Sequence, residues 1–249
     1  MKIRPAAILT SPKLVVGLML YAAFLVFVLT LDQTRLGVEG AAEKYVQSFF
    51  CAVDLPFFPY KIPLLGGFFV GVLFVGVLSA SLITYKKGKM EAFGFAMVHA
   101  SLVLLVISGF LQCFWRQQAY LTLAENQTAN KLTLYSQSGK ATGTVNLLYS
   151  ITLKKFEVEN WQNSDIAKEY SSTLAFEKDG VLDIKTVKMN APVQYGAWTY
   201  FQSGYLNDGK TTVLLAVKNP VKILPYLALI LVVLGSLIMY SQKLFVSRK

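Results

Sequence analysis

The chain has 249 residues, of which 54% are hydrophobic and 15% are charged, and its formal net charge is +10. Two cysteines and one histidine are too few for a disulfide-built scaffold or a zinc cluster. The basic excess would suit a nucleic-acid partner, but no aromatic residues interleave the basic groups, so we expect no nucleic-acid binding.

Four apolar runs predict transmembrane helices. Each is about as long as a helix needs to cross a ~30 Å hydrocarbon core at ~1.5 Å per residue. None has an acidic or basic residue at its centre. The runs cover residues 14–31, 62–84, 94–115 and 222–241.

The first run follows a basic tail, residues 1–13, as a signal peptide would. Its apolar part is longer than a signal core, and no cleavage pattern of small residues follows in "LTLDQTRLG". We therefore expect a retained membrane anchor.

The next segment, residues 32–61, is rich in Phe, Tyr and Pro, which suits the boundary between lipid and water. We expect an interfacial half-helix that ends near Pro56. Cys51 lies in this segment and Cys113 lies near the same end of the third run, so a disulfide is conceivable there. Two unpaired thiols are the favoured alternative.

Basic residues indicate how the helices are oriented. They lie in the tail 1–13, in the loop 85–93 and in the tail 242–249. A four-pass topology puts all three segments on one side, which the positive-inside rule makes cytoplasmic. We therefore expect both termini in the cytoplasm, and residues 32–61 and 116–221 on the external side.

The one histidine, His99, lies inside the apolar run "GFAMVHASLVLLVISGF". A helix entering near Phe93 would bury it about 9 Å deep, in the cytoplasmic third of the membrane. An ionisable group at that depth is a functional hypothesis, because burying polar groups in lipid is costly. One alternative is a helix–helix hydrogen bond to Ser79 or Ser81. The other is one half of a haem axial pair, with the second half supplied by a partner.

Three lysines, Lys86, Lys87 and Lys89, lie near the same membrane face as His99. They are candidate contacts for haem propionates, although the positive-inside rule already explains their location.

Residues 116–221 predict a small, mostly antiparallel β domain. Stretches such as "TVNLLYSITLKKFEVENW" and "APVQYGAWTYFQSGY" are β-branched and aromatic, with short alternating patterns. "EKDG" and "LNDG" lie between such stretches as turn signals. The predicted fold class is therefore α+β, with four transmembrane helices and an extracytoplasmic domain of roughly six to nine strands between helices three and four.

This predicted domain contains no histidine and no cysteine, which excludes Ser-His-Asp and Cys-His catalysis in it. No Walker loop or dinucleotide-binding glycine pattern follows a strand. Carboxylates such as Glu157 and Asp179 are interpreted as solvated groups on strands and turns. We therefore name no catalytic residue and expect this chain to be non-catalytic alone.

Three features together resemble a known family. Three helices precede a large external β domain and a fourth helix. In the third helix, "HASLVLLVISGF" is similar to the family's run of one histidine with apolar residues. In the β domain, "YSSTLAF…VKMNAPVQYGAWTYFQSGY" is similar to a strand pattern that ends in Asn-x-Pro and a Tyr-Gln-Ser-x-Tyr-like segment. Those residues are Asn190, Pro192, Tyr200, Gln202, Ser203 and Tyr205, with Phe201 inserted after the first tyrosine.

On these motifs the chain resembles the ResB-like (CcsB) proteins of the system II cytochrome c biogenesis pathway, over nearly its full length. It departs from the family pattern in two places. The external domain is short, and the Asp-Pro-Gly that often precedes the last helix appears as Asn219, Pro220 and Val221.

The resemblance implies a membrane subunit of a holocytochrome c synthase (haem lyase) in the bacterial cytoplasmic (inner) membrane. Haem b would pass across the membrane in transit, with His99 as an axial ligand, before its covalent attachment to external apocytochrome c. The implied partners are a CcsA (ResC)-type membrane protein, apocytochrome c and membrane lipids.

Partner or substrate docking by the motif residues of the β domain is a weaker implication, because turn and core positions explain them as well. The residues are Asn190, Pro192, Tyr200, Gln202 and Tyr205. The alternative function is a structural or assembly subunit of a larger membrane (respiratory) complex, with no haem of its own.

Overall fold

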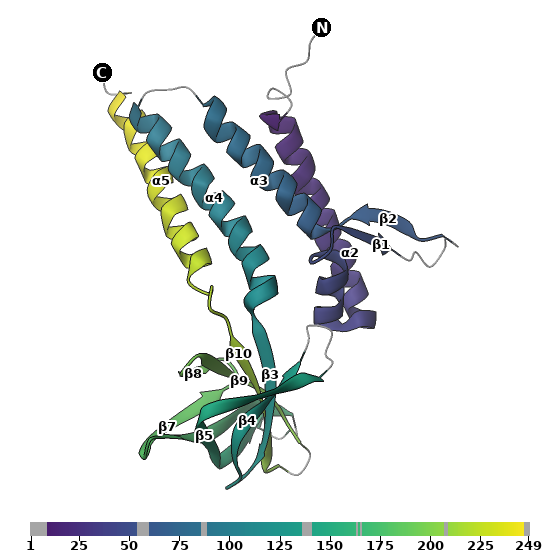
Figure 1. Ribbon diagram of the computed structural model, residues 1–249, viewed down its shortest axis with the longest axis vertical. Coiled ribbons are helices and arrows are strands. Elements are labelled where there is room, and N and C mark those ends of the chain that lie inside the picture. The colour runs from purple at the N-terminus through teal and green to yellow at the C-terminus, as the bar shows by residue number, and fades with distance from the viewer. Residues whose placement is uncertain are drawn as a thin grey trace. The chain divides into compact units, whose positions relative to one another are not determined.

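The computed structural model describes residues 9–53, 60–85, 89–135, 141–162, 164, 166–206 and 209–246. The chain divides into two compact units, which are Met1–Phe114 with Val221–Lys249, and Trp115–Pro220. The first unit holds the helices and the second holds an antiparallel sheet (Figure 1). The prediction of four apolar helices and a mostly antiparallel β domain is confirmed.

Four helices are long and apolar enough to cross a membrane. A helix suits that environment because it satisfies its own backbone hydrogen bonds. The third helix starts at Lys89 rather than at the predicted residue 94. The helices are α2 (Pro12–Tyr45), α3 (Gly67–Thr84), α4 (Lys89–Trp115) and α5 (Leu224–Val246).

Glycines make the closest contacts between these helices. A Cβ atom added to Gly94 of α4 would lie 3.0 Å from the carbonyl oxygen of Gly235 of α5, and the reverse distance is also 3.0 Å. The two backbones therefore nearly touch, a contact that lipid-embedded helices achieve with small residues. On the other side of α4, a Cβ at Gly71 of α3 would lie 2.7 Å from the ring of Phe110.

Helix α2 has a sharp break at Gly37, whose φ is 71° and ψ is 169°. Glycine adopts a positive φ without the steric cost of a Cβ atom. After the break the chain folds back, so that Lys44 Nζ and Tyr45 Oη each donate to Asp32 Oδ2 at 2.8 Å. One carboxylate thus holds the two arms of α2 together.

A half-helix is present in residues 38–45, as predicted for the segment 32–61, but it ends at Tyr45 rather than near Pro56. The segment after α2 has no further helix among the described residues up to β2. It forms a hairpin of strands β1 (Phe50–Val53) and β2 (Ile62–Leu65), while Pro56 lies outside the described residues. Prolines recur through this segment, and proline lacks the N–H that a helix interior requires. Of the aromatic residues that suggested a lipid boundary, Phe49 and Phe50 contact Phe68 and Phe69 of α3 but remain exposed, as does Tyr60.

The second unit is one eight-stranded antiparallel sheet in the order β7-β6-β5-β4-β3-β10-β9-β8. The "EKDG" signal forms the β6–β7 turn, where Asp179 and Gly180 have φ values of 52° and 80°. Two successive positive φ values are what a tight two-residue hairpin turn needs. The strands are β3 (Gln117–Ala124), β4 (Thr128–Tyr135), β5 (Ala141–Asn160), β6 (Ala167–Lys178), β7 (Val181–Lys188), β8 (Val193–Tyr195), β9 (Trp198–Tyr205) and β10 (Thr211–Lys218).

The sheet curls around its own core. Ser172 on β6 hydrogen-bonds to residues of β9 and β10, although β5, β4 and β3 separate β6 from β10 in the sheet order. Large side chains that fill the interior include Leu123, Leu153, Phe176 and Leu214.

Within this apolar core lies a closed polar set of Ser172, Gln202 and Thr212. Ser172 Oγ lies 2.7 Å from Gln202 Oε1 and 2.8 Å from Thr212 Oγ1. Gln202 Nε2 donates to Thr212 Oγ1 at 2.8 Å and to the carbonyl of Gly204 at 3.1 Å. Ser172 Oγ donates toward both other side chains, and Thr212 Oγ1 accepts from Ser172 and from Gln202. These hydrogen bonds join three strands and offset much of the cost of burying the polar groups.

Replacing Gln202 by alanine leaves two buried hydroxyls short of partners. We expect Gln202→Ala to lower the free energy of unfolding by ~2–4 kcal/mol. Gln117→Ala, at an exposed position of β3, should change it by less than ~0.5 kcal/mol. Thermal unfolding of the full chain in detergent, followed by near-ultraviolet circular dichroism, measures both. Equal Tm values for the two variants would contradict the structural role of the closed polar set.

Candidate functional site

The imidazole of His99 is held by its own helix. Its Nδ1 lies 3.1 Å from the carbonyl oxygen of Phe95, one turn earlier on α4. A carbonyl only accepts, so Nδ1 carries the hydrogen and Nε2 keeps its lone pair. Nε2 has no hydrogen-bond partner among the residues that the structure describes. An imidazole in this tautomer can bind a metal ion through Nε2.

The imidazole is the last of three stacked rings, and the other two, Tyr85 and Phe95, fix its plane. The ring centroids of Tyr85 and Phe95 are 3.7 Å apart, and those of Phe95 and His99 are 3.8 Å apart. Tyr85 Oη donates to Glu91 Oε1 at 3.1 Å, which ties the first ring to the start of α4. One face of the imidazole is therefore covered while one edge is hydrogen-bonded, and Nε2 is left for another group.

The alternative hydrogen bond from His99 to helix α3 is not formed. Ser81 Oγ donates instead to the carbonyl of Val77 on its own helix at 2.9 Å. Across the described part of the chain, neither Ser79 nor Ser81 bonds to His99. The alternative in which His99 only joins two helices through a hydrogen bond to Ser79 or Ser81 is therefore not supported by such a bond.

The predicted lysine contacts cannot be placed beside His99. Lys86 and Lys87 lie outside the described residues, and Lys89 is described only as the first residue of α4, without its side chain. Their role at haem propionates stays a prediction.

The motif residues of the β unit fall into two groups. Tyr200 and Gln202 are buried, and the Tyr200 hydroxyl lies 2.7 Å from that of Tyr149. Burial raises the pKa of Tyr200 above its ordinary range, so its hydroxyl stays protonated and serves as a hydrogen-bonding group. Asn190, Pro192 and Tyr205 have exposed side chains, the first two at the turn between β7 and β8. Docking by these three residues stays a prediction.

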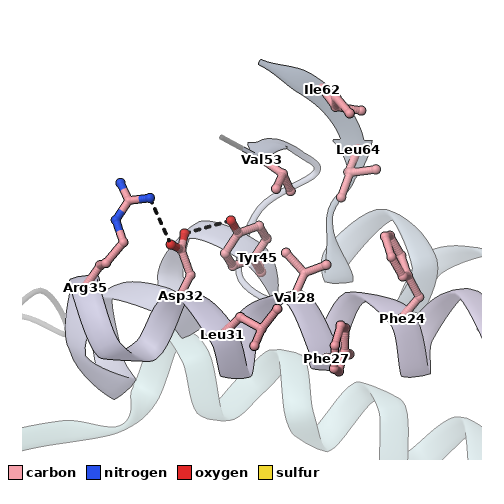
Figure 2. A pocket seen from close by; sticks show the side chains of 10 residues that line it. All are labelled: Phe24, Phe27, Val28, Leu31, Asp32, Arg35, Tyr45, Val53, Ile62 and Leu64. Carbon is pink, nitrogen blue, oxygen red and sulfur yellow. Dashed lines mark hydrogen bonds and ion pairs between the residues drawn. The ribbon is translucent and has the colours of Figure 1, made fainter. Parts of the chain in front are cut away.

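A second candidate site, which the sequence did not suggest, is an apolar cavity of about 420 Å³ beside α2 (Figure 2). Its polar end is Asp32, which accepts from Tyr45 and lies 3.6 Å from Arg35 Nη1. The one feature of the sequence that could have indicated this cavity is the position of Asp32 directly after the first apolar run. The cavity is lined by Phe24, Phe27, Val28, Leu31, Asp32, Arg35, Tyr45, Val53, Ile62 and Leu64.

This α2 cavity can enclose an apolar group but offers no metal site. Eight of its lining residues are apolar or aromatic, and its size is within the range of small-molecule pockets. The described residues contain no group of three His, Cys, Asp or Glu side chains placed to hold a metal ion. The hydrogen bonds from Lys44 and Tyr45 to Asp32 hold the folded-back arm of α2 in place, and we call them the Asp32 brace. Asp32 and Tyr45 of this brace also line the cavity.

Removing this brace should open the folded-back arm of α2. Asp32→Ala leaves Lys44 and the buried Tyr45 hydroxyl without their acceptor, so we expect the local opening free energy of residues 38–45 to fall by ~2–3 kcal/mol. Arg35→Ala removes only an exposed, long ion pair and should cost less than ~1 kcal/mol. Hydrogen exchange measured by mass spectrometry in nanodiscs reports both values. Unchanged exchange in Asp32→Ala would argue against the brace.

The two cysteines are not joined to each other. Cys51 lies on β1, and Cys113 on α4 donates through its thiol to the carbonyl of Gly109 at 3.3 Å. Burial raises the pKa of the Cys51 thiol, so less of the reactive thiolate is present near neutral pH.

This pKa shift predicts slow alkylation of Cys51. With Cys113 changed to serine, iodoacetamide at about pH 8 should modify Cys51 at least ~5-fold more slowly than a cysteine placed at exposed Lys154. The rate should keep rising above about pH 9, because the thiolate fraction of a thiol with a raised pKa is still increasing there. A rate that levels off below pH 8 would show a lowered pKa instead.

The helices and the sheet define the class of this protein. Four apolar helices, with an antiparallel sheet inserted between the last two, describe a multi-pass membrane protein with one β unit. A model of the ResB-like family matches residues 76–225, which is more than half of the chain. The chain belongs to the ResB-like family. The match includes His99, its helix and the whole β unit.

Individual relatives match more loosely. Protein NrfI of Wolinella succinogenes is 34% identical over 93 residues, a match that covers 36% of this chain and 10% of NrfI. Among solved structures, cytochrome c heme lyase CcmF overlays on 96% of this chain and 36% of its own, at 10% identity and a TM-score of 0.40. That overlay is too loose to carry an argument. The chain spans only a small part of either relative's length.

Proposed function

We propose that this chain is a membrane subunit for cytochrome c biogenesis in which His99 binds haem iron during passage across the bilayer. The observation that carries the proposal is the Nδ1–H bond to Phe95, which leaves Nε2 as the one ligand-competent nitrogen in an apolar helix. Membership of the ResB-like family supports it. Haem b is here a substrate in transit toward covalent attachment to apocytochrome c.

The residues around His99 fit a flat ligand. Ala96 and Ala100 flank the histidine on α4, and both are exposed. Alanine adds only a methyl group to the helix surface, so a macrocycle can approach Nε2 closely. The neutral form of imidazole is the one that ligates iron, through the nitrogen that carries no hydrogen.

A single histidine completes only half of an axial pair, and the chain has no second one. A partner membrane protein of the CcsA (ResC) type would supply the other ligand. We further propose that Lys86, Lys87 and Lys89 contact the propionates from the cytoplasmic side. The external side would carry the β unit, with Asn190, Pro192 and Tyr205 available to the partner or to apocytochrome c.

The orientation of the chain is part of this proposal. The basic segments before α2, between α3 and α4, and after α5 support cytoplasmic termini in a bacterial inner membrane. Haem would then enter at the end of α4 that lies nearer His99 and leave toward the β unit.

The test is a visible absorption spectrum and a haem stain of the protein purified with its membrane neighbours. We expect His99→Gly to lose at least ~10-fold of the bound haem, and added imidazole to restore it by entering the vacated space and ligating iron. Ala100→Gly is the matched control, because it adds the same helix-weakening residue one position away at a cost of about 1 kcal/mol. Maturation of a co-expressed cytochrome c should follow the haem content.

A haem content unchanged in His99→Gly would overturn the ligand role. The haem would then belong to the partner, and this chain would be a structural or assembly subunit. Loss of haem in both glycine variants, without rescue by imidazole, would likewise assign the effect to the helix rather than to the ligand.

A further inference from the structure

Strand β5 extends past its neighbour on one side. Its pairing with β6 begins at Ser150 opposite Glu177, and the preceding residues, 141–149, lie beyond the end of β6. On their other side residues 141–146 pair with β4. Among the described residues no strand pairs with the outer edge of residues 141–149. A strand edge of this kind presents unused N–H and C=O groups, which other chains can recognise.

A cleft of about 430 Å³ lies along this open edge. One wall is the β5 segment 145–149, and another is the hairpin turn between β8 and β9, residues 195–198. The two walls are fixed to each other, because Tyr149 Oη donates to the carbonyl of Tyr195 at 3.2 Å. Gly196 has a φ of 59° at the turn, and a Cβ atom there would come within 3.3 Å of the Tyr149 ring. The cleft is therefore built by close packing.

The lining of this β5 cleft is apolar and positively charged. Leu148 is 86% exposed and offers an apolar contact at the open edge. Lys178, at the end of β6, and Lys218, at the end of β10, also line the cleft, and no acidic residue does. Neither lysine forms an ion pair within the part of the chain that the structure describes. The cleft thus combines an unpaired backbone edge, an apolar contact and two cations.

We propose that the β5 cleft binds an extended acidic peptide segment of a partner protein, which adds to the open edge as a further strand. Backbone hydrogen bonds to residues 141–149 would supply affinity, as in other cases of strand addition. A side chain of the added strand would cover Leu148, and its carboxylates would pair with Lys178 and Lys218. The open edge argues for a peptide, since a backbone edge complements another backbone. Because no acidic residue lines the cleft beside its two lysines, a second copy of the cleft would bring like charges together, which argues against a second copy as the occupant.

The proposal rests on the sheet alone and is independent of haem binding at His99. Its test uses the full chain in nanodiscs of neutral phosphatidylcholine, so that lipid charge does not compete. The probe is a fluorescein-labelled nine-residue peptide of alternating valine and glutamate, with binding measured by fluorescence anisotropy. Two matched probes carry lysine in place of glutamate, or N-methyl groups on alternate amides of the acidic sequence.

We expect the acidic peptide to bind at least ~10-fold more tightly than the lysine peptide, because both ion pairs are replaced by repulsion. N-methylation should weaken it by a similar factor, because it blocks the hydrogen bonds of one backbone edge. The double variant Lys178→Glu/Lys218→Glu should reverse the preference between acidic and basic peptides. Lys154→Glu/Lys168→Glu changes the net charge equally at positions outside the cleft lining and should leave the preference intact.

Four results would overturn the proposal. They are equal affinity for acidic and basic peptides, equal affinity for the N-methylated peptide, no binding at about 1 mM peptide, or the same effect from both double variants. Self-association of the chain that disappears in Lys178→Glu/Lys218→Glu would assign the cleft to a second copy instead. His99→Gly should bind the peptide like the wild type, which separates this test from that of the haem proposal.

Discussion

Lipid offers no hydrogen-bond partner, so a polar side chain on a membrane helix must find its partner within the protein. Several in this chain use the carbonyl one turn earlier on their own helix. Ser81 bonds to Val77, Ser101 to Met97, Ser108 to Leu105 and Ser241 to Ile238. His99 follows the same rule toward Phe95. A serine has then satisfied its one hydrogen, whereas an imidazole still has a second nitrogen. The same constraint therefore leaves His99 with one ring nitrogen that has no partner among the described residues, which is what the ligand role proposed above requires.

The β unit obeys the same requirement by a different route. Its interior polar groups lie on separate strands, so Ser172, Gln202 and Thr212 satisfy one another across the curled sheet. This arrangement gives Gln202, a residue of the family-like motif, a structural role that explains its place in the chain. The cations at the β5 cleft show the contrasting case, because Lys178 and Lys218 can be solvated and need no internal partner.

Local patterns in the sequence predicted what depends on local physics. Run length and hydropathy predicted four apolar helices, alternation predicted the strands, and "EKDG" predicted the β6–β7 turn. The bond from His99 to Phe95 spans one helical turn and was within reach of the same reasoning. What the sequence could not show depends on partners far apart in the chain. The fold-back that joins Asp32 to Tyr45 and the link from Ser172 to Thr212 both require the three-dimensional arrangement. The residues around Phe50 were predicted to continue a half-helix toward Pro56 but form a strand, because a short apolar and aromatic run suits a strand as well as a helix.

The close contact of Gly94 with Gly235 has a consequence for how the protein is made. Helix α4 ends at Trp115 and α5 begins at Leu224, so roughly a hundred residues are synthesised between the two helices. At a synthesis rate of about 5–20 residues per second, α5 follows α4 by roughly 5–20 seconds. During that interval α4 lies in the bilayer with its glycine surface against lipid or an insertion factor. The β unit is therefore synthesised when only the first of its two flanking helices has been made, and the helix pair is completed only when α5 follows.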